Sequence, residues 1–191
     1  MLYFIGIVPP PQIHSTIAGI QNQYGNNRIE PHITLRHPFT PVDEEEWLSK
    51  ASEVISGFIP FTIQLPGTGN FGSRVLYISV KSEQLNNLYH GLIPALSPFE
   101  PEEKKRGEEF HPHLTLGRTW CGFSKEDFAA MRKLADEYLK KEPVLFEVNF
   151  VRIYYKPDPK KGYQMFKDVG LVPHPNPPSK GVHWDRKGGL S

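Results

Sequence analysis

A short histidine and threonine pattern occurs twice in this chain of 191 residues. It appears first as Pro31-His32-Ile33-Thr34-Leu35 and again, 81 positions later, as Pro112-His113-Leu114-Thr115-Leu116. Histidine has an ordinary pKa of about 6.5, so near neutral pH it can take a proton in one state and give one in the other. Threonine hydroxyls can donate hydrogen bonds to oxygens that gain negative charge. The repeat therefore predicts two similar sets of groups suited to phosphoryl chemistry without a metal.

Both segments have the composition of short β-strands. Side chains alternate between the two faces of a strand, so His32 and Thr34 should share one face about 6.5–7 Å apart, as should His113 and Thr115. We expect one histidine to act as base, the other as acid, and the threonines to stabilise the phosphoryl oxygens. Neither set suffices alone, so the two must face one groove. The sequence does not say which histidine is the base.

The hydrophobic pattern around these segments predicts an α+β protein of two similar halves. Strands are expected at residues 2–8, 31–35, 61–65, 75–80, 112–116, 144–155 and 163–169. Helices are expected at residues 14–24, 43–56, 82–94 and 124–141. A doubly wound nucleotide-binding sheet is disfavoured, because the chain lacks its glycine-rich turn between strand and helix.

Composition narrows the classes of protein further. The 22 Lys and Arg against 21 Asp and Glu give a formal charge of +1, so any contact with a polyanion must be local. The single cysteine, Cys121, cannot form an intramolecular disulfide and fits a reducing compartment. The apolar run at 2–8 is too short to span a membrane and lacks the basic leader of a signal peptide. We expect a cytoplasmic monomer that needs neither metal nor cofactor.

The length fits one domain. We expect that domain at residues 1–171, with a first half at about 1–97 and a second at about 110–171. A charged connector would join the halves, and residues 172–191 would form a Pro/Gly-rich tail that is extended or weakly docked.

The tetrapeptides His32-Ile33-Thr34-Leu35 and His113-Leu114-Thr115-Leu116 resemble those of the two-histidine phosphoesterase superfamily. This superfamily includes the 2'-5' RNA ligases, which are better described as RNA 2',3'-cyclic phosphodiesterases. The resemblance covers residues 1–171 and includes Gly117-Arg118 after the second motif. Two departures are the segment 36–39, which is closer to the small bacterial members than to the RNA enzymes, and the tail, which matches nothing in the family.

The resemblance implies a bilobal, pseudo-twofold α+β fold in which antiparallel sheets flanked by helices enclose a central cleft. It also implies metal-independent hydrolysis of RNA 2',3'-cyclic phosphate ends or related 2'-5' linkages. His32 and His113 would be the acid–base pair, with Thr34 and Thr115 as oxyanion donors. The substrate would be an RNA end or a small nucleotide.

Further substrate-binding candidates follow the motifs and lie near the end of the domain. Arg36 and Arg118 come after the two threonines and could bind phosphate, although surface ion pairs are an alternative. Phe39 and Tyr163 could stack on a base, although aromatic residues on strands usually belong to the core. Five basic residues between positions 152 and 167 form a local positive patch that could guide RNA, or simply be solvated.

Four other interpretations remain open from the sequence. The two motif histidines could be structural, or His111 and His113 could bind a metal together with Glu108 or Glu109. The chain could be a non-catalytic module that binds RNA ends. It could also hydrolyse another small cyclic phosphoester.

Overall fold

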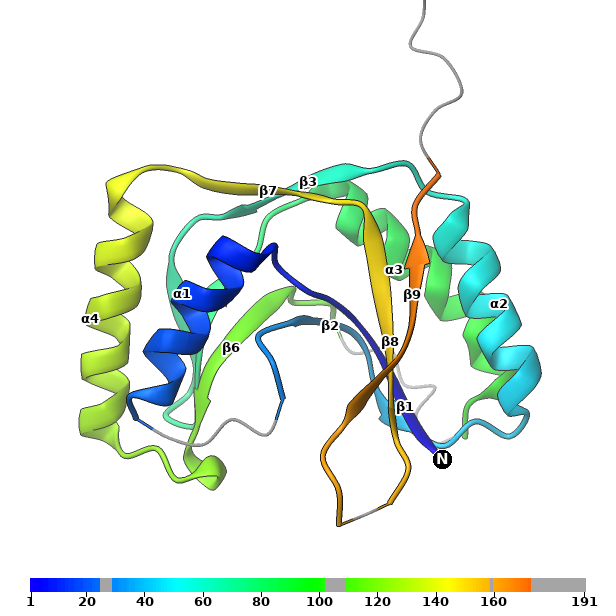
Figure 1. Ribbon diagram of the computed structural model, residues 1–191, viewed down its shortest axis with the longest axis horizontal. Coiled ribbons are helices and arrows are strands. Elements are labelled where there is room, and N and C mark those ends of the chain that lie inside the picture. The colour runs from blue at the N-terminus through cyan, green and yellow to red at the C-terminus, as the bar shows by residue number, and fades with distance from the viewer. Residues whose placement is uncertain (25–28, 102–108, 159, 173–191) are drawn as a thin grey trace, which may run out of the picture.

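The computed structural model describes residues 1–24, 29–101, 109–158 and 160–172 (Figure 1). A seven-stranded sheet runs in the order β4-β5-β6-β2-β1-β8-β9, and β3 and β7 form a separate two-stranded ribbon. The strands are β1 (Leu2–Ile7), β2 (Ile33–Phe39), β3 (Phe61–Leu65), β4 (Thr68–Phe71), β5 (Val75–Ser79), β6 (His113–Arg118), β7 (Val144–Val148), β8 (Phe150–Lys156) and β9 (Gln164–Gly170). Every pairing between these strands is antiparallel. The predicted α+β class with antiparallel sheets is confirmed.

Helices flank the two ends of the large sheet (Figure 1). They are α1 (Pro11–Asn22), α2 (Glu44–Ser56), α3 (Glu83–Leu96) and α4 (Lys125–Lys141), with short 3-10 turns η1 (Ser97–Phe99) and η3 (Thr119–Cys121). Helices α1 and α4 contact each other, α1 contacts β6, and α4 contacts β4 and β5. At the other end, α2 packs against α3 and β9. The two sequence halves therefore interleave, because α1 lies with α4 and the late strand β8 pairs with β1.

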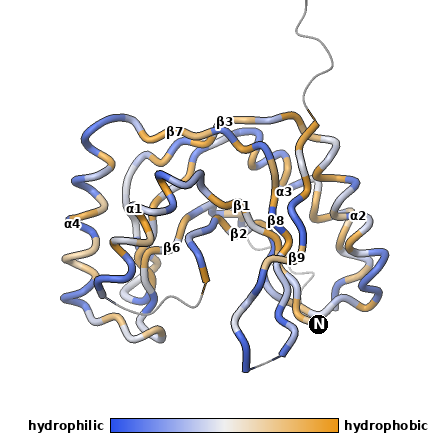
Figure 2. The backbone as a smooth tube through the Cα atoms, viewed as in Figure 1, coloured by the Kyte–Doolittle hydropathy of each residue, from blue (hydrophilic) through white to orange (hydrophobic). Residues whose placement is uncertain are grey.

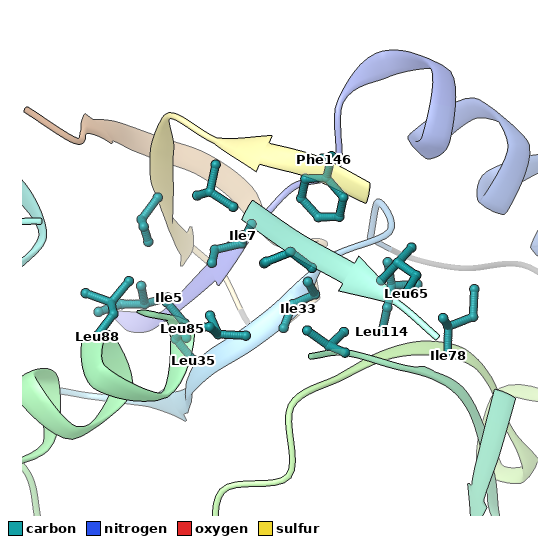
Figure 3. Packing of buried hydrophobic residues seen from close by; sticks show 14 of the residues in the cluster. Ile5, Ile7, Ile33, Leu35, Leu65, Ile78, Leu85, Leu88, Leu114 and Phe146 are labelled. Atoms are coloured by element: carbon teal, nitrogen blue, oxygen red, sulfur yellow. The ribbon is translucent and has the colours of Figure 1, made fainter. Parts of the chain in front are cut away.

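One face of the large sheet is the wall of the core (Figure 3). Ile5, Ile33 and Leu114 project from β1, β2 and β6, the central strands, and are fully buried. Leu88 of α3 and Phe146 of β7 are buried in the same cluster. Burying each large aliphatic side chain contributes roughly 1.5–3 kcal/mol to folding, which holds this face of the sheet against the core. Because side chains alternate along a strand, the residues between the buried ones then lie on the opposite face. The opposite face is therefore the one available for chemistry.

Helix ends follow the sequence signals closely. Asp43, Ser82 and Ser124 each accept a hydrogen bond from a main-chain N–H in the first turn of α2, α3 and α4, respectively. Ser124 and Asp127 complete a reciprocal capping box. These side chains satisfy N–H groups that have no partner inside the helix, so residues of these types mark helix starts in a sequence. The starts of these three helices were therefore predictable to within a residue or two.

Three boundaries differ from the sequence predictions. Helix α1 begins at Pro11, because proline fits the first position of a helix, where its missing N–H costs nothing. Strand β2 continues through Pro38 to Phe39, where a register shift against β1 accommodates it. The stretch 144–155 is two strands belonging to different sheets.

Candidate active site

The two motifs lie side by side at the centre of the large sheet. Strands β2 and β6 are antiparallel neighbours, with Ile33 opposite Leu114. This register places His32 opposite Thr115 and Thr34 opposite His113, on the face away from the core. Directly opposite side chains have Cβ atoms about 4.5–5.5 Å apart, and diagonal ones are about 7–8 Å apart. Each histidine therefore neighbours the threonine of the other motif, and the histidines are diagonal to each other.

All four side chains are half-buried rather than enclosed in the core. The imidazoles are held by equivalent contacts: Nδ1 of His32 lies 2.8 Å from the main-chain oxygen of Glu30, and Nδ1 of His113 lies 2.7 Å from that of His111. A carbonyl oxygen can only accept a hydrogen bond, so Nδ1 is the protonated nitrogen in the neutral ring. Nε2 is then left to exchange a proton with a ligand.

Both histidines favour the neutral form. Burial lowers the pKa of His32 to about 4, and the positive charge of Arg118 acts in the same direction. Burial also lowers the pKa of His113, with further lowering from His111 and Arg118. The hydrogen bonds to Glu30 and His111 oppose these shifts without cancelling them. An anionic phosphate in the site would stabilise the protonated forms and raise both pKa values.

The ring of His32 fits closely against strands β1 and β8. Its centroid lies 5.2 Å from that of Phe4 and 5.9 Å from that of Tyr154. A Cβ at Gly6 would lie 3.4 Å from Cδ2 of His32 and 3.1 Å from the main-chain oxygen of Ile33. Glycine therefore lets β1 pass close beside the imidazole, and the surrounding rings account for its desolvation.

The segment before His32 is anchored through the carboxylate of Glu30. This carboxylate accepts hydrogen bonds from Nη1 of Arg152 at 2.8 Å and from the hydroxyl of Tyr154 at 2.7 Å, and Nε2 of His14 lies 3.5 Å away. Burial and the bond to Glu30 raise the pKa of Tyr154, so its hydroxyl stays protonated as a donor. The carbonyl that holds His32 is thus part of a fixed residue.

Aromatic residues of β4 and β5 surround His113. The ring of Phe71 meets it edge-on at 4.9 Å, and that of Tyr77 lies at 5.3 Å. Nε2 of His111 lies 3.1 Å from the hydroxyl of Tyr77. A Cβ at Gly69 would lie 2.6 Å from the Tyr77 ring, so the glycine lets β4 pack directly on this tyrosine.

A pocket of about 890 Å³ opens beside the motif strands. It is lined by Gln21, Ile29, Glu30, Pro31, His32, Thr115, Arg118, Trp120, Cys121, Lys156, Lys160, Lys161, Gly162 and Tyr163. The lining includes His32 and Thr115, whereas Thr34 and His113 lie next to it on the same two strands. Four cationic side chains against one carboxylate make the pocket positive and suited to an anion.

The four additional sequence candidates separate into two groups. Arg118 and Tyr163 line the pocket, and Nη2 of Arg118 lies 3.4 Å from Oγ1 of Thr115. Arg36 instead forms a buried ion pair with Glu100, with Nε 3.1 Å from Oε1.

Phe39 is also outside the pocket lining. It is buried and packs edge-on against the indole of Trp47 at 5.4 Å. Its alternation on β2 and its apolar partner place it in the core. Neither Arg36 nor Phe39 lines the pocket.

Within the described ranges, no group of three or more His, Cys, Asp or Glu side chains could hold a metal ion. Glu108, one of the carboxylates considered for a metal site with His111 and His113, lies outside the described residues. His111 already uses Nε2 with Tyr77. The same ranges contain no helix that is both long and apolar enough to cross a membrane. The tail from residue 173 also lies outside the described part of the chain.

Several pocket residues were not predicted as part of the site. Glu30 precedes the first motif, and Trp120 and Cys121 follow the second, so proximity to the motifs was the available signal. Gln21 gave no such signal. It reaches the site because α1 packs on β6, where its Nε2 donates to the main-chain oxygen of Thr115 at 2.9 Å.

Comparison with known families and proteins identifies relatives. Residues 9–159 match the family model described as the 2'-5' RNA ligase superfamily. A Geobacillus kaustophilus protein named "Putative phosphoesterase GK0864" is 30% identical over 148 residues, covering 73% of this chain and 82% of that protein. A Bacillus cereus protein of similar name is 29% identical over 141 residues, covering 70% and 79%, respectively.

Solved structures share the fold at low sequence identity. The Thermus thermophilus protein TT0787 aligns with a TM-score of 0.65 and 20% identity, covering 90% of this chain and 98% of that one. LigT of E. coli, crystallised with 3'-AMP, aligns with a TM-score of 0.57 and 21% identity, covering 89% and 97%. These alignments support the same α+β architecture.

Proposed function

The chain belongs to the 2'-5' RNA ligase superfamily, and on this basis we propose that it is a phosphodiesterase that opens RNA 2',3'-cyclic phosphate ends or cleaves related 2'-5' linkages. The observation that carries the proposal is the pairing of Ile33 with Leu114, which sets both histidine and threonine motifs on one face. Relatives named as phosphoesterases support the reaction class. The crystals of E. coli LigT with 3'-AMP support a nucleotide ligand.

We assign His32 as the base and His113 as the acid. Burial lowers the pKa of His32 to about 4, so this ring is neutral near neutral pH and its Nε2, on the pocket wall, can take the proton of an attacking water. The water oxygen forms a bond to phosphorus while the bond from phosphorus to one ribose oxygen breaks. Protonated His113 supplies a proton to that ribose oxygen, and the product is a phosphate monoester with a free hydroxyl.

The hydroxyls and Arg118 would stabilise the charge on the phosphoryl oxygens. Thr34 and Thr115 lie beside opposite histidines, so they can donate from two sides of one phosphate. The guanidinium of Arg118 lies beside Thr115 and is permanently charged. A trigonal-bipyramidal phosphorus, which carries more negative charge on its non-bridging oxygens, would gain most from these donors.

Turnover of adenosine 2',3'-cyclic phosphate by the purified chain tests this function. We expect conversion to one adenosine monophosphate, with chromatography against the 2' and 3' standards identifying which bond breaks. A 2'-5'-linked diadenosine serves as the second substrate. Stoichiometric binding of a cyclic-phosphate RNA end without turnover of either compound would favour the binding-module alternative. Turnover of only a cyclic sugar phosphate would favour the other hydrolase alternative.

Chelation separates this mechanism from a metal-dependent one. Two histidines can move both protons, and the hydroxyls and arginine can stabilise charge, so activity should survive EDTA and should not rise with added divalent ions. Loss of turnover on chelation, restored by one metal ion, would contradict the acid–base assignment and favour a site at His111 and His113.

A further inference from the structure

The hairpin loop between β8 and β9 contributes a cluster of positive charge to the pocket, in addition to Arg118. Lys156, Lys160 and Lys161 all line it. The loop projects beyond the end of the sheet in Figure 1, and Figure 2 shows it as a hydrophilic segment. The same hairpin carries Arg152, but both Nε and Nη2 of this residue bind Asp168 at 2.7 Å. The three lysines therefore differ from that arginine in facing the pocket.

In the described part of the chain, no carboxylate forms an ion pair with these lysines. The carboxylate of Asp158, the nearest acid in sequence, accepts a hydrogen bond from the main-chain N–H of Lys160 at 2.8 Å and so shapes the turn. Glu30, the carboxylate of the pocket lining, is already bound by Arg152 and Tyr154. Grouped cations without acidic partners repel one another, so an anion entering this pocket would be stabilised.

The lysines reach the pocket from the β8–β9 hairpin, whereas Thr115 and Arg118 reach it from β6. The centroid of the Phe4 ring lies 5.2 Å from that of His32 and 4.9 Å from that of Tyr163. Nζ of Lys156 lies 5.7 Å from the centroid of Tyr163. Lys156 is thus linked to His32 through the rings of Tyr163 and Phe4, in a chain of three contacts.

We propose that the lysine cluster binds a second phosphate of the substrate, carried on the 5' oxygen of the nucleoside whose 2',3'-cyclic phosphate reacts. This inference rests on the proposed function and adds a substrate class to it. Tyr163, a half-buried residue of the pocket lining that contacts Lys156, would then lie beside the ribose. A pocket of about 890 Å³ is at the upper end of the usual range of about 300–1,000 Å³ and has room for a nucleotide with two phosphates.

Two substrates carry this chemistry, and both are tested beside one that lacks it. Adenosine 2',3'-cyclic phosphate is the reference. Its 5'-phosphorylated form has the second phosphate as a monoester, and diadenosine ending in a 2',3'-cyclic phosphate has it as the internucleotide diester. Hydrogen bonds to charged groups are stronger than those between neutral groups, so we expect kcat/KM to rise roughly 10-fold with the added phosphate. A gain confined to the dinucleotide assigns the site to RNA, and one confined to the 5'-monophosphate assigns it to mononucleotides.

Variants then locate the effect. The double change Lys160→Ala with Lys161→Ala should bring the ratio of kcat/KM between phosphorylated and reference substrates close to one, while the double change to Arg should retain most of it. Lys141→Ala, an exposed lysine at the end of α4, is the matched control and should keep the parental ratio. Equal kcat/KM for all three substrates in the parent, or equal loss on all three in the Ala variant, would overturn the proposal.

A binding measurement keeps this inference separate from the proposed function. If no substrate is turned over, the hydrolase proposal fails, but calorimetry with adenosine 3',5'-bisphosphate and with 3'-AMP still tests the second site. Tighter binding of the bisphosphate by the parent, lost in the Lys160 and Lys161 double Ala variant, supports the lysine site. Equal affinities for the two compounds would contradict it.

Discussion

His32 and His113 are held by the same contact, in which Nδ1 meets the main-chain oxygen of the residue two positions earlier at 2.8 Å and 2.7 Å, respectively. The antiparallel pairing of their strands turns one motif against the other, so each ring lies beside the opposite threonine. Repetition of the anchoring contact gives both rings the same tautomer. The difference between them lies in their surroundings, which is what an acid and a base require.

The threonine hydroxyls are tested by changing Thr34 or Thr115 to Val. Valine keeps the branched shape that suits a strand and removes only the donor, so kcat should fall about 10-fold or more at each site. The melting temperature should change little, because both side chains are half-buried on the face away from the core. Thr62→Val, at an exposed position of β3, is the control. Parental kcat in both variants would show that the hydroxyls do not contact the reacting group.

The close passage of β1 beside His32 predicts a kinetic effect of Gly6→Ala. The added methyl would lie 3.1 Å from the main-chain oxygen of Ile33, so the backbone beside His32 must shift by a few tenths of an ångström, and it would contact the imidazole at 3.4 Å. We expect kcat/KM to fall by roughly 10-fold, because small displacements of a positioned group are costly to rate. Gly19→Ala in α1 meets nothing within 4 Å and should preserve activity while stabilising the helix by about 0.5–1 kcal/mol. An unchanged rate in Gly6→Ala would mean that the ring position is not limiting.

The lowered pKa values predict a slightly acidic optimum for kcat/KM. His32 must be neutral, which holds above about pH 4, and His113 must be protonated, which holds below a pKa that is itself under 6.5. The profile should therefore peak between about pH 4 and 6.5 and fall roughly tenfold per pH unit above that window. Because bound phosphate favours the protonated rings, the kcat profile should lie at higher pH than the kcat/KM profile.

The two limbs of this profile belong to the pair of histidines rather than to either alone, since the rings interact. In residual activity of His113→Ala the alkaline limb should disappear. A parental kcat/KM that keeps rising through pH 8 would contradict His113 as the proton donor.

Much of the fold was predictable because its signals are local. Asp43, Ser82 and Ser124 mark helix starts, and the alternation around Ile33 and Leu114 marks central strands. Strand β4 was missed as an element of its own, because its four residues Thr-Gly-Asn-Phe carry no apolar alternation. It forms by pairing with β5 and by close packing of Gly69 on Tyr77.

The motif residues of the candidate site were predictable because their chemistry and their repetition coincide. The motif residues needed just the strand period and one cross-strand register to come together. Arg36 and Arg118 looked equivalent in sequence, yet a buried Glu100, 64 positions away, pairs with the former. Phe39 was ambiguous for the same reason, since its partner Trp47 lies on a helix whose docking the sequence does not specify.

Alanine replacement of each motif histidine tests the central claim most directly. With adenosine 2',3'-cyclic phosphate, His32→Ala and His113→Ala should each lower kcat by about 10²–10⁴-fold, because each removes one proton-transfer partner. The control His90→Ala, an exposed histidine on α3, should keep parental turnover, and all three variants should melt as folded proteins. Near-parental turnover in both His32→Ala and His113→Ala would contradict the paired acid–base mechanism.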